Sequence, residues 1–255
     1  MKQYNQRELE DFVRGFKKAA NIIAMEKPDH ILAPVIGAVP FVDVLSIVDR
    51  HFPLETVSYP PNSSRFANRD ELMSVWNLNF LRENYANESL KIMTIDEVIS
   101  GSSAVKGHIQ FRQAIEGLAR EKAKGLENEV DALRHYTRKL GREISYQILG
   151  ITENRGRKLT PSFNRLINQK VARRIDFSKV FTMDNIDLNT IRLKVGPINA
   201  QRRQNYLPEI ERFEVGPEYV EFLQDIARCV GADPKNVSPV NLGKIQESLS
   251  KYLKQ

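Results

Sequence analysis

Cysteine is almost absent from this chain. Cys229 is the only one, so no disulfide can form within it, and a reducing compartment is its natural location. No run of about 18 apolar residues is present that could cross a membrane. The first residues, Met1 to Glu8, contain no apolar signal core. We therefore expect a cytoplasmic protein that makes no membrane contact.

Histidine is also scarce, with four residues, and no cysteine or histidine cluster has the spacing of a metal site. What remains is an ordinary globular composition, with 41% hydrophobic and 27% charged residues, which argues against global disorder. A length of 255 residues suffices for one sizeable core plus an accessory region, or for two small domains.

The formal net charge of +6 is a local feature. Residues 153–174 contain one acid, Glu153, and seven basic side chains: Arg155, Arg157, Lys158, Arg165, Lys170, Arg173 and Arg174. Such a segment suits an anionic partner such as phosphate, nucleotide or nucleic acid, and it is equally typical of a solvated surface helix.

Hydrophobic periodicity predicts strands that alternate with helices. The expected strands cover residues 30–35, 54–59, 91–95, 145–151 and 177–183. The expected helices cover residues 6–26, 41–50, 70–80, a long stretch from 103, 217–230 and 241–253. This alternation predicts an α/β fold, with a mainly parallel five-stranded sheet flanked by helices.

The same pass along the chain suggests three parts. Residues 1–28 form an N-terminal helix that is a candidate hood over a site. Residues 29–185 form the α/β domain, with a long connection at 61–89 and a helical insertion at about 115–143. Residues 186–255 form a mostly helical C-terminal extension.

The segment Lys91 to Ala104 carries the clearest chemistry. An apolar strand runs into two adjacent carboxylates, Asp96 and Glu97. A small loop follows, composed of Ser100, Gly101, Ser102 and Ser103. Backbone N–H groups and hydroxyls at a helix N-terminus bind phosphate, whereas carboxylates accept hydrogen bonds from a sugar diol or hold Mg²⁺ beside a pyrophosphate. The pattern therefore suits a phosphorylated sugar.

This segment resembles the motif that binds 5-phosphoribosyl 1-pyrophosphate (PRPP) in the type I phosphoribosyltransferase family. The resemblance implies that Asp96 and Glu97 meet the ribose hydroxyls and, indirectly, Mg²⁺. It also implies that the loop at 100–103 holds the 5-phosphate. Ser102 and Ala104 stand where the family often has glycine and threonine.

An earlier segment, 31–40, resembles the family's first strand and pyrophosphate loop, here Ile36, Gly37 and Ala38. The connection at 61–89 then corresponds to a mobile flap. Its only basic residues are Arg65, Arg69 and Arg82, and it contains no lysine. We take Arg65 and Arg69 as its catalytic candidates.

Two functions follow from the resemblance. The first is an enzyme that transfers the 5-phosphoribosyl group from PRPP to an unidentified nitrogen nucleophile, with Mg²⁺ as cofactor. The second is a non-catalytic PRPP or nucleotide sensor that contacts nucleic acid or a partner protein through residues 153–174. We also expect a homodimer, because an apolar stripe exceeds the needs of a short crossover helix. The stripe consists of Leu126, Val130, Leu133, Thr137, Leu140 and Ile144.

Overall fold

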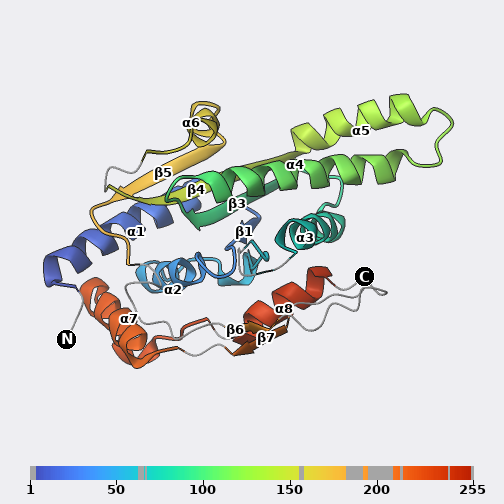
Figure 1. The fold of residues 1–255 in the computed structure, drawn as a ribbon. Coiled ribbons are helices and arrows are strands. Elements are labelled where there is room, and N and C mark those ends of the chain that lie inside the picture. Colours follow the sequence, from blue (N-terminus) through green and yellow to red (C-terminus); the bar gives the residue numbers. More distant parts are fainter. Residues whose placement is uncertain are drawn as a thin grey trace.

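A five-stranded sheet organises the protein. The structure is a computed structural model that describes residues 4–62, 66, 68–154, 158–181, 192–194, 209–212, 215–240 and 242–253. The strands are β1 (His30–Leu32), β2 (Val57–Ser58), β3 (Leu90–Glu97), β4 (Ile144–Glu153) and β5 (Ala172–Phe177). They pair in the order β2-β1-β3-β4-β5, and every pair is parallel (Figure 1). The predicted α/β class and parallel sheet are thus confirmed.

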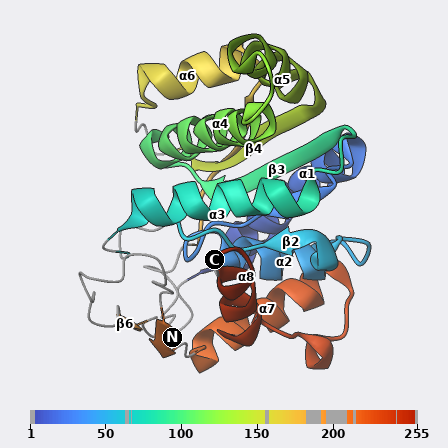
Figure 2. The same cartoon turned by 90° about the vertical axis from the view of Figure 1, so that its right-hand side faces the viewer.

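Helices cover both faces of this sheet. On one face lie α1 (Gln6–Glu26) and α2 (Val39–Val48), which contact each other. On the other lie α3 (Arg69–Asn84), α4 (Ser102–Ala123) and α6 (Pro161–Asn168), with α4 in contact with both neighbours (Figure 2). The crossover from β1 leads to β2, and the crossover from β3 leads to β4, in the opposite direction along the sheet. When both crossovers are right-handed, their helices lie on opposite faces of the sheet.

The long helical stretch of the insertion is a hairpin of α4 and α5 (Glu129–Glu143). The expected apolar stripe divides along it. Leu140 and Ile144 are buried, whereas Leu126 and Val130 are 45% and 61% exposed. The half of the stripe nearest the sheet therefore belongs to the core, and only the end near the hairpin turn is free for another contact.

The C-terminal segment completes the core. Helix α7 (Pro217–Val230) packs on α1 and α2, while α8 (Leu242–Leu253) packs on α3. A short antiparallel pair, β6 (Arg192–Lys194) and β7 (Glu209–Arg212), lies between β5 and α7 in the sequence and was not predicted.

Asp43 of α2 ties this segment to the sheet. Its carboxylate, 2% exposed, accepts hydrogen bonds from the Tyr219 hydroxyl (2.6 Å) and the Val240 N–H (2.7 Å). Burial raises the pKa of Asp43 to about 7, although both hydrogen bonds act in the opposite direction. At the edge of the sheet, the Ser248 hydroxyl accepts a hydrogen bond from the Tyr59 N–H (2.7 Å).

The position of the fifth strand was predicted wrongly. The prediction was 177–183, but β5 covers Ala172–Phe177 and ends where the prediction began. In this edge strand, Arg173, Arg174 and Asp176 are exposed between buried residues. These charged residues interrupt the run of apolar residues from which a buried strand is predicted. Val180 and Phe181 are buried beyond the strand, and residues 182–183 lie outside the described part.

The second strand was predicted too long. Residues Leu54–Thr56 form a short 3-10 turn, and β2 contains only two residues. Among the described residues, no helix has the length and apolar character needed to cross a membrane.

The buried carboxylate of Asp43 should make stability depend on pH. Because its pKa is raised in the folded state, the folded protein binds a proton more strongly than the unfolded chain between pH about 4 and about 7. As the pH rises through this window, the unfolding free energy of the wild type should therefore fall by about 1.4 kcal/mol per pH unit relative to that of Asp43→Asn. Urea unfolding of both proteins at several pH values measures this, and parallel pH profiles would contradict it.

The free end of the apolar stripe should hold two copies together. Leu126→Glu with Val130→Glu should convert a dimer to a monomer in sedimentation experiments at micromolar protein concentration, because charges there would be buried in the interface. Met25→Glu, at an apolar side chain on α1 that is 79% exposed, is the control. A wild-type protein that sediments as a monomer contradicts the prediction.

Candidate functional site

After β1, the chain separates from the neighbouring strand β3. The last residue pair between β1 and β3 is Leu32 with Thr94, and β3 continues for three more residues. After β1 the chain follows β2 instead. The Ala33 N–H donates to the Ser58 carbonyl (2.9 Å), and the Val35 N–H donates to the Pro60 carbonyl (3.0 Å). The strand order reverses here, which is the place where open α/β sheets bind ligands.

The loop after β1 faces the end of β3. Ile36 and Ala38 are buried, whereas Gly37 between them is exposed. A Cβ atom at Gly37 would lie 3.8 Å from Oδ1 of Asp96. The peptide bond before Ile36 is cis. The backbone of the loop at 36–38 thus lies beside the carboxylate of Asp96, near the end of β3.

Asp96 occupies a nearly enclosed position at the end of β3. It is 8% exposed, and burial raises the pKa of its carboxyl to about 7, with the neighbouring Glu97 carboxylate adding to the effect. A hydrogen bond from the Glu97 backbone opposes this rise. Glu97 itself is half-buried. A carboxylate with this little solvent gains from a cation or from hydroxyl donors beside it.

The small loop after β3 ends at the N-terminus of α4. Gly101 precedes the helix and has no side chain to cap its first turn. Ser102 and Ser103 are exposed there. The Ser100 hydroxyl lies 3.2 Å from the Ser102 hydroxyl and 3.4 Å from the Ser102 N–H. The backbone N–H groups of the first turn, the serine hydroxyls and the positive end of the helix dipole together form an environment suited to an anion.

Gly101 allows this turn because it has no side chain. Its φ is +84°, in the left-handed region, and a Cβ atom would lie 2.4 Å from Cγ of Phe163 on α6. Phe163 is fully buried, and the Ser100 carbonyl accepts a hydrogen bond from the Thr160 N–H (2.9 Å), just before α6. The loop therefore rests on α6, which the sequence had not predicted.

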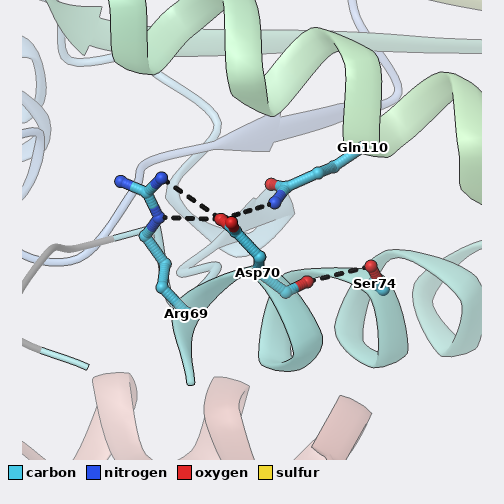
Figure 3. A network of polar contacts seen from close by, with 4 residues as sticks. All are labelled: Arg69, Asp70, Ser74 and Gln110. Carbon is cyan, nitrogen blue, oxygen red and sulfur yellow. Dashed lines mark hydrogen bonds and ion pairs between the residues drawn. The ribbon is translucent and has the colours of Figure 1, made fainter. Parts of the chain in front are cut away.

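The base of the predicted flap is attached to α4. Figure 3 shows Arg69 and Asp70 at the start of α3, with Gln110 approaching from α4. Oδ1 of Asp70 accepts hydrogen bonds from Nε and Nη2 of Arg69, both at 3.2 Å, and from Nε2 of Gln110 at 2.9 Å. The Arg69 guanidinium holds the pKa of Asp70 below its usual value. Arg65, the other catalytic candidate of the flap, lies outside the described residues.

Arg82 does not lie near Arg69 and Asp70 at the start of α3. It lies in the last turn of α3 and bonds to Glu121 near the end of α4, with Nε to Oε2 at 3.0 Å. Since both helices begin near the carboxyl edge of the sheet, their last turns are at the opposite end. Arg82 therefore joins α3 to α4 and is remote from Asp96.

Sequence reasoning missed Gln110. Its side chain is 8% exposed, its Nε2 holds Asp70, and its Oε1 is buried without a hydrogen-bond partner. Forty residues separate it from Asp70 in the sequence. No local pattern connects the two, so only the packing of α3 on α4 identifies the pair.

The basic segment 153–174 is partly neutralised. Arg173 forms an ion pair with Glu26 (2.6 Å), and Arg174 pairs with Asp176 (3.2 Å). Arg155 and Arg157 lie outside the described residues. Lys158, Arg165 and Lys170 remain as its basic side chains without an acidic partner in the described ranges.

Comparisons with protein-family models, with curated proteins and with solved structures found no match for this chain. The inference of function therefore depends on the geometry of the two loops and of Asp96.

The close contact of Gly101 with Phe163 predicts a specific loss of stability. Gly101→Ala should cost about 1–2 kcal/mol for the left-handed backbone and about 1–3 kcal/mol more for the steric overlap. Gly125→Ala is the matched control, because its φ is +79° and no atom lies within 4 Å of the added Cβ. Urea unfolding measures both, and equal losses in the two variants would contradict the contact.

Proposed function

We propose that this chain binds PRPP in the crevice between the loop at 36–38 and the end of β3. The observation that carries the proposal is the 3.8 Å approach of the Gly37 Cβ position to Oδ1 of Asp96, at the point where the strand order reverses. About sixty residues separate these loops in the sequence. The segments 31–40 and 91–104 each resemble the type I phosphoribosyltransferases, and this resemblance requires the loop at 36–38 and the end of β3 to be adjacent.

Each part of PRPP has a partner in this proposal. The ribose 2′- and 3′-hydroxyls donate to Asp96 and Glu97. The enclosed carboxylate of Asp96 is well suited to accept such hydrogen bonds. The 5-phosphate accepts hydrogen bonds from the loop at 100–103, in which Ser102 and Ser103 are exposed at the start of α4. The pyrophosphate accepts from the backbone of the loop at 36–38, where Gly37 lets the diphosphate approach closely.

The residues present are compatible with Mg²⁺ at this site. Within the described ranges, no group of three or more histidine, cysteine, aspartate or glutamate residues could hold a metal by itself. Mg²⁺ needs no such group, because it keeps several waters and binds through one or two carboxylates together with substrate phosphates. Asp96 and Glu97 are the carboxylates that would face it, and the ion would neutralise charge on the pyrophosphate.

The reaction we propose is phosphoribosyl transfer to a nitrogen nucleophile. The C1–oxygen bond of PRPP breaks, and its electron pair leaves with pyrophosphate. The nitrogen lone pair forms the new C1–N bond, and the proton of that nitrogen is released. The chain contributes by positioning and by electrostatics: carboxylates near the ribose tolerate positive charge on its ring, and backbone N–H groups hold the leaving group.

A second candidate function is a PRPP sensor without transferase activity. The specific observation in its favour is the state of the flap cations. Arg69 is bonded to Asp70, and Arg82 is bonded to Glu121. Both flap arginines within the described ranges are thus paired with acids, whereas several members of the family place a basic flap side chain on the departing pyrophosphate. Release of pyrophosphate from PRPP in the presence of a panel of nucleobases distinguishes the two functions.

Replacing both acids should abolish PRPP binding while the fold is retained. Calorimetry with PRPP and Mg²⁺ should give binding to the wild type and none to Asp96→Asn with Glu97→Gln, because amides neither attract Mg²⁺ nor accept from the diol as strongly. The circular dichroism spectrum should be unchanged.

The matched control is Glu55→Gln with Glu127→Gln. It removes two exposed carboxylates elsewhere in the chain and should leave PRPP affinity unaltered. Unchanged affinity in the Asp96 and Glu97 double variant, or no binding to the wild type at millimolar PRPP, would overturn the proposal.

A further inference from the structure

The outward face of α5 carries an array of basic side chains. The opposite side of the helix packs on α4 and on the start of β4, with Leu140 buried and Leu133 and Tyr136 partly buried. Arg134, Arg138 and Arg142 are exposed. At a spacing of four residues they lie on one face, along a rise of about 12 Å. His135 is exposed beside this row, and Lys139 next to it is half-buried.

Little in the structure neutralises this array. Arg134 has one long contact, 3.4 Å to Asp131, and both side chains are mostly exposed, so the pair contributes little. For Arg138, Lys139 and Arg142, no acidic partner is found within the part of the chain that the structure describes. Glu143, the nearest acid in sequence after Arg142, is bonded to the Tyr85 hydroxyl.

The arrangement is unfavourable for the helix itself. Like charges four residues apart destabilise a helix by about 0.2–0.5 kcal/mol per pair. Other helices of the protein place opposite charges at such spacings, as in Asp11 with Arg14 and Asp225 with Arg228. The helix dipole favours cations only in the last turn, so it accounts for Arg142 but not for Arg134 or Arg138.

The shape and chemistry of the face define its partner. Guanidinium groups bind phosphate oxygens through two parallel hydrogen bonds. A membrane would require an apolar helix face to insert, and the apolar face of α5 is occupied by α4. A peptide needs a groove or a strand edge, whereas the face is the convex side of a helix. A row of arginines on a straight rod matches a row of backbone phosphates.

We propose that the outward face of α5 binds the phosphate backbone of nucleic acid. This differs from the expectation based on residues 153–174, in which Arg173 and Arg174 are paired with acids. Helix α6 of that segment lies with α5 at the same end of the molecule in both views (Figures 1 and 2). Its basic residues therefore form the natural comparison, and the proposal does not depend on PRPP binding.

Fluorescence anisotropy with a 30-base-pair DNA duplex, titrated at several salt concentrations, tests the proposal. Each phosphate contact contributes about 0.9 to the slope of log affinity against log salt concentration. Arg134→Gln, Arg138→Gln and Arg142→Gln together should lower that slope by about 2.7 and weaken binding at low salt by at least about tenfold. PRPP binding by this variant should be unchanged.

Two further variants make the result specific. Arg14→Gln, Lys17→Gln and Lys18→Gln remove the same charge from exposed positions of α1, on the other face of the sheet, and should leave most of the slope intact. Lys158→Gln, Arg165→Gln and Lys170→Gln test the segment around α6 and should have the smaller effect. A duplex RNA of the same length shows which nucleic acid is preferred.

The salt dependence of binding by these variants decides whether α5 contacts the phosphate backbone. Loss of binding and slope in the α5 variant alone supports the proposal. No binding of the wild type to either duplex at low salt overturns it, as does an equal loss in the α1 and α5 variants, which would indicate a response to net charge. Binding only to vesicles with anionic lipids would also overturn it.

Discussion

The candidate site depends on the divergence of the chain from β3 after Leu32. Two backbone hydrogen bonds, from Ala33 to Ser58 and from Val35 to Pro60, direct the chain along β2, while β3 continues to Glu97. Without this divergence Asp96 would pair with a neighbouring strand on both sides. With it, a carboxylate of low exposure lies beside the exposed backbone of Gly37. Every partner that we propose for PRPP is arranged around that opening.

The rest of the fold supports this opening from several sides. Asp43 in α2, the helix that follows the loop at 36–38, is bonded to Tyr219 and Val240 of the C-terminal segment. The loop after β3 rests on Phe163 of α6. The C-terminal segment thus supports the helix that follows the loop at 36–38, and α6 supports the loop at 100–103.

The α4–α5 hairpin is partly core and partly exposed surface. Its inner half shares the core through Leu140 and Ile144, whereas its outer surface carries exposed apolar residues at the turn and arginines along α5. Val130 lies four residues before Arg134, in the same row as the three arginines. A contact between copies at the turn would therefore share this face of α5 with nucleic acid.

Local patterns in the sequence determined most of the secondary structure and the location of the two loops. Apolar periodicity and glycine turns act over a few residues, and α1, β3, α7 and α8 appear close to the predicted ranges. The fifth strand was misplaced because Arg173, Arg174 and Asp176 interrupt its apolar pattern. Tertiary structure alone decided that Gly37 meets Asp96, that Gln110 holds Asp70, and that Arg173 is neutralised by Glu26. The reason is physical: these contacts join residues dozens of positions apart, and their distances follow from how helices and strands pack, which no short stretch of sequence encodes.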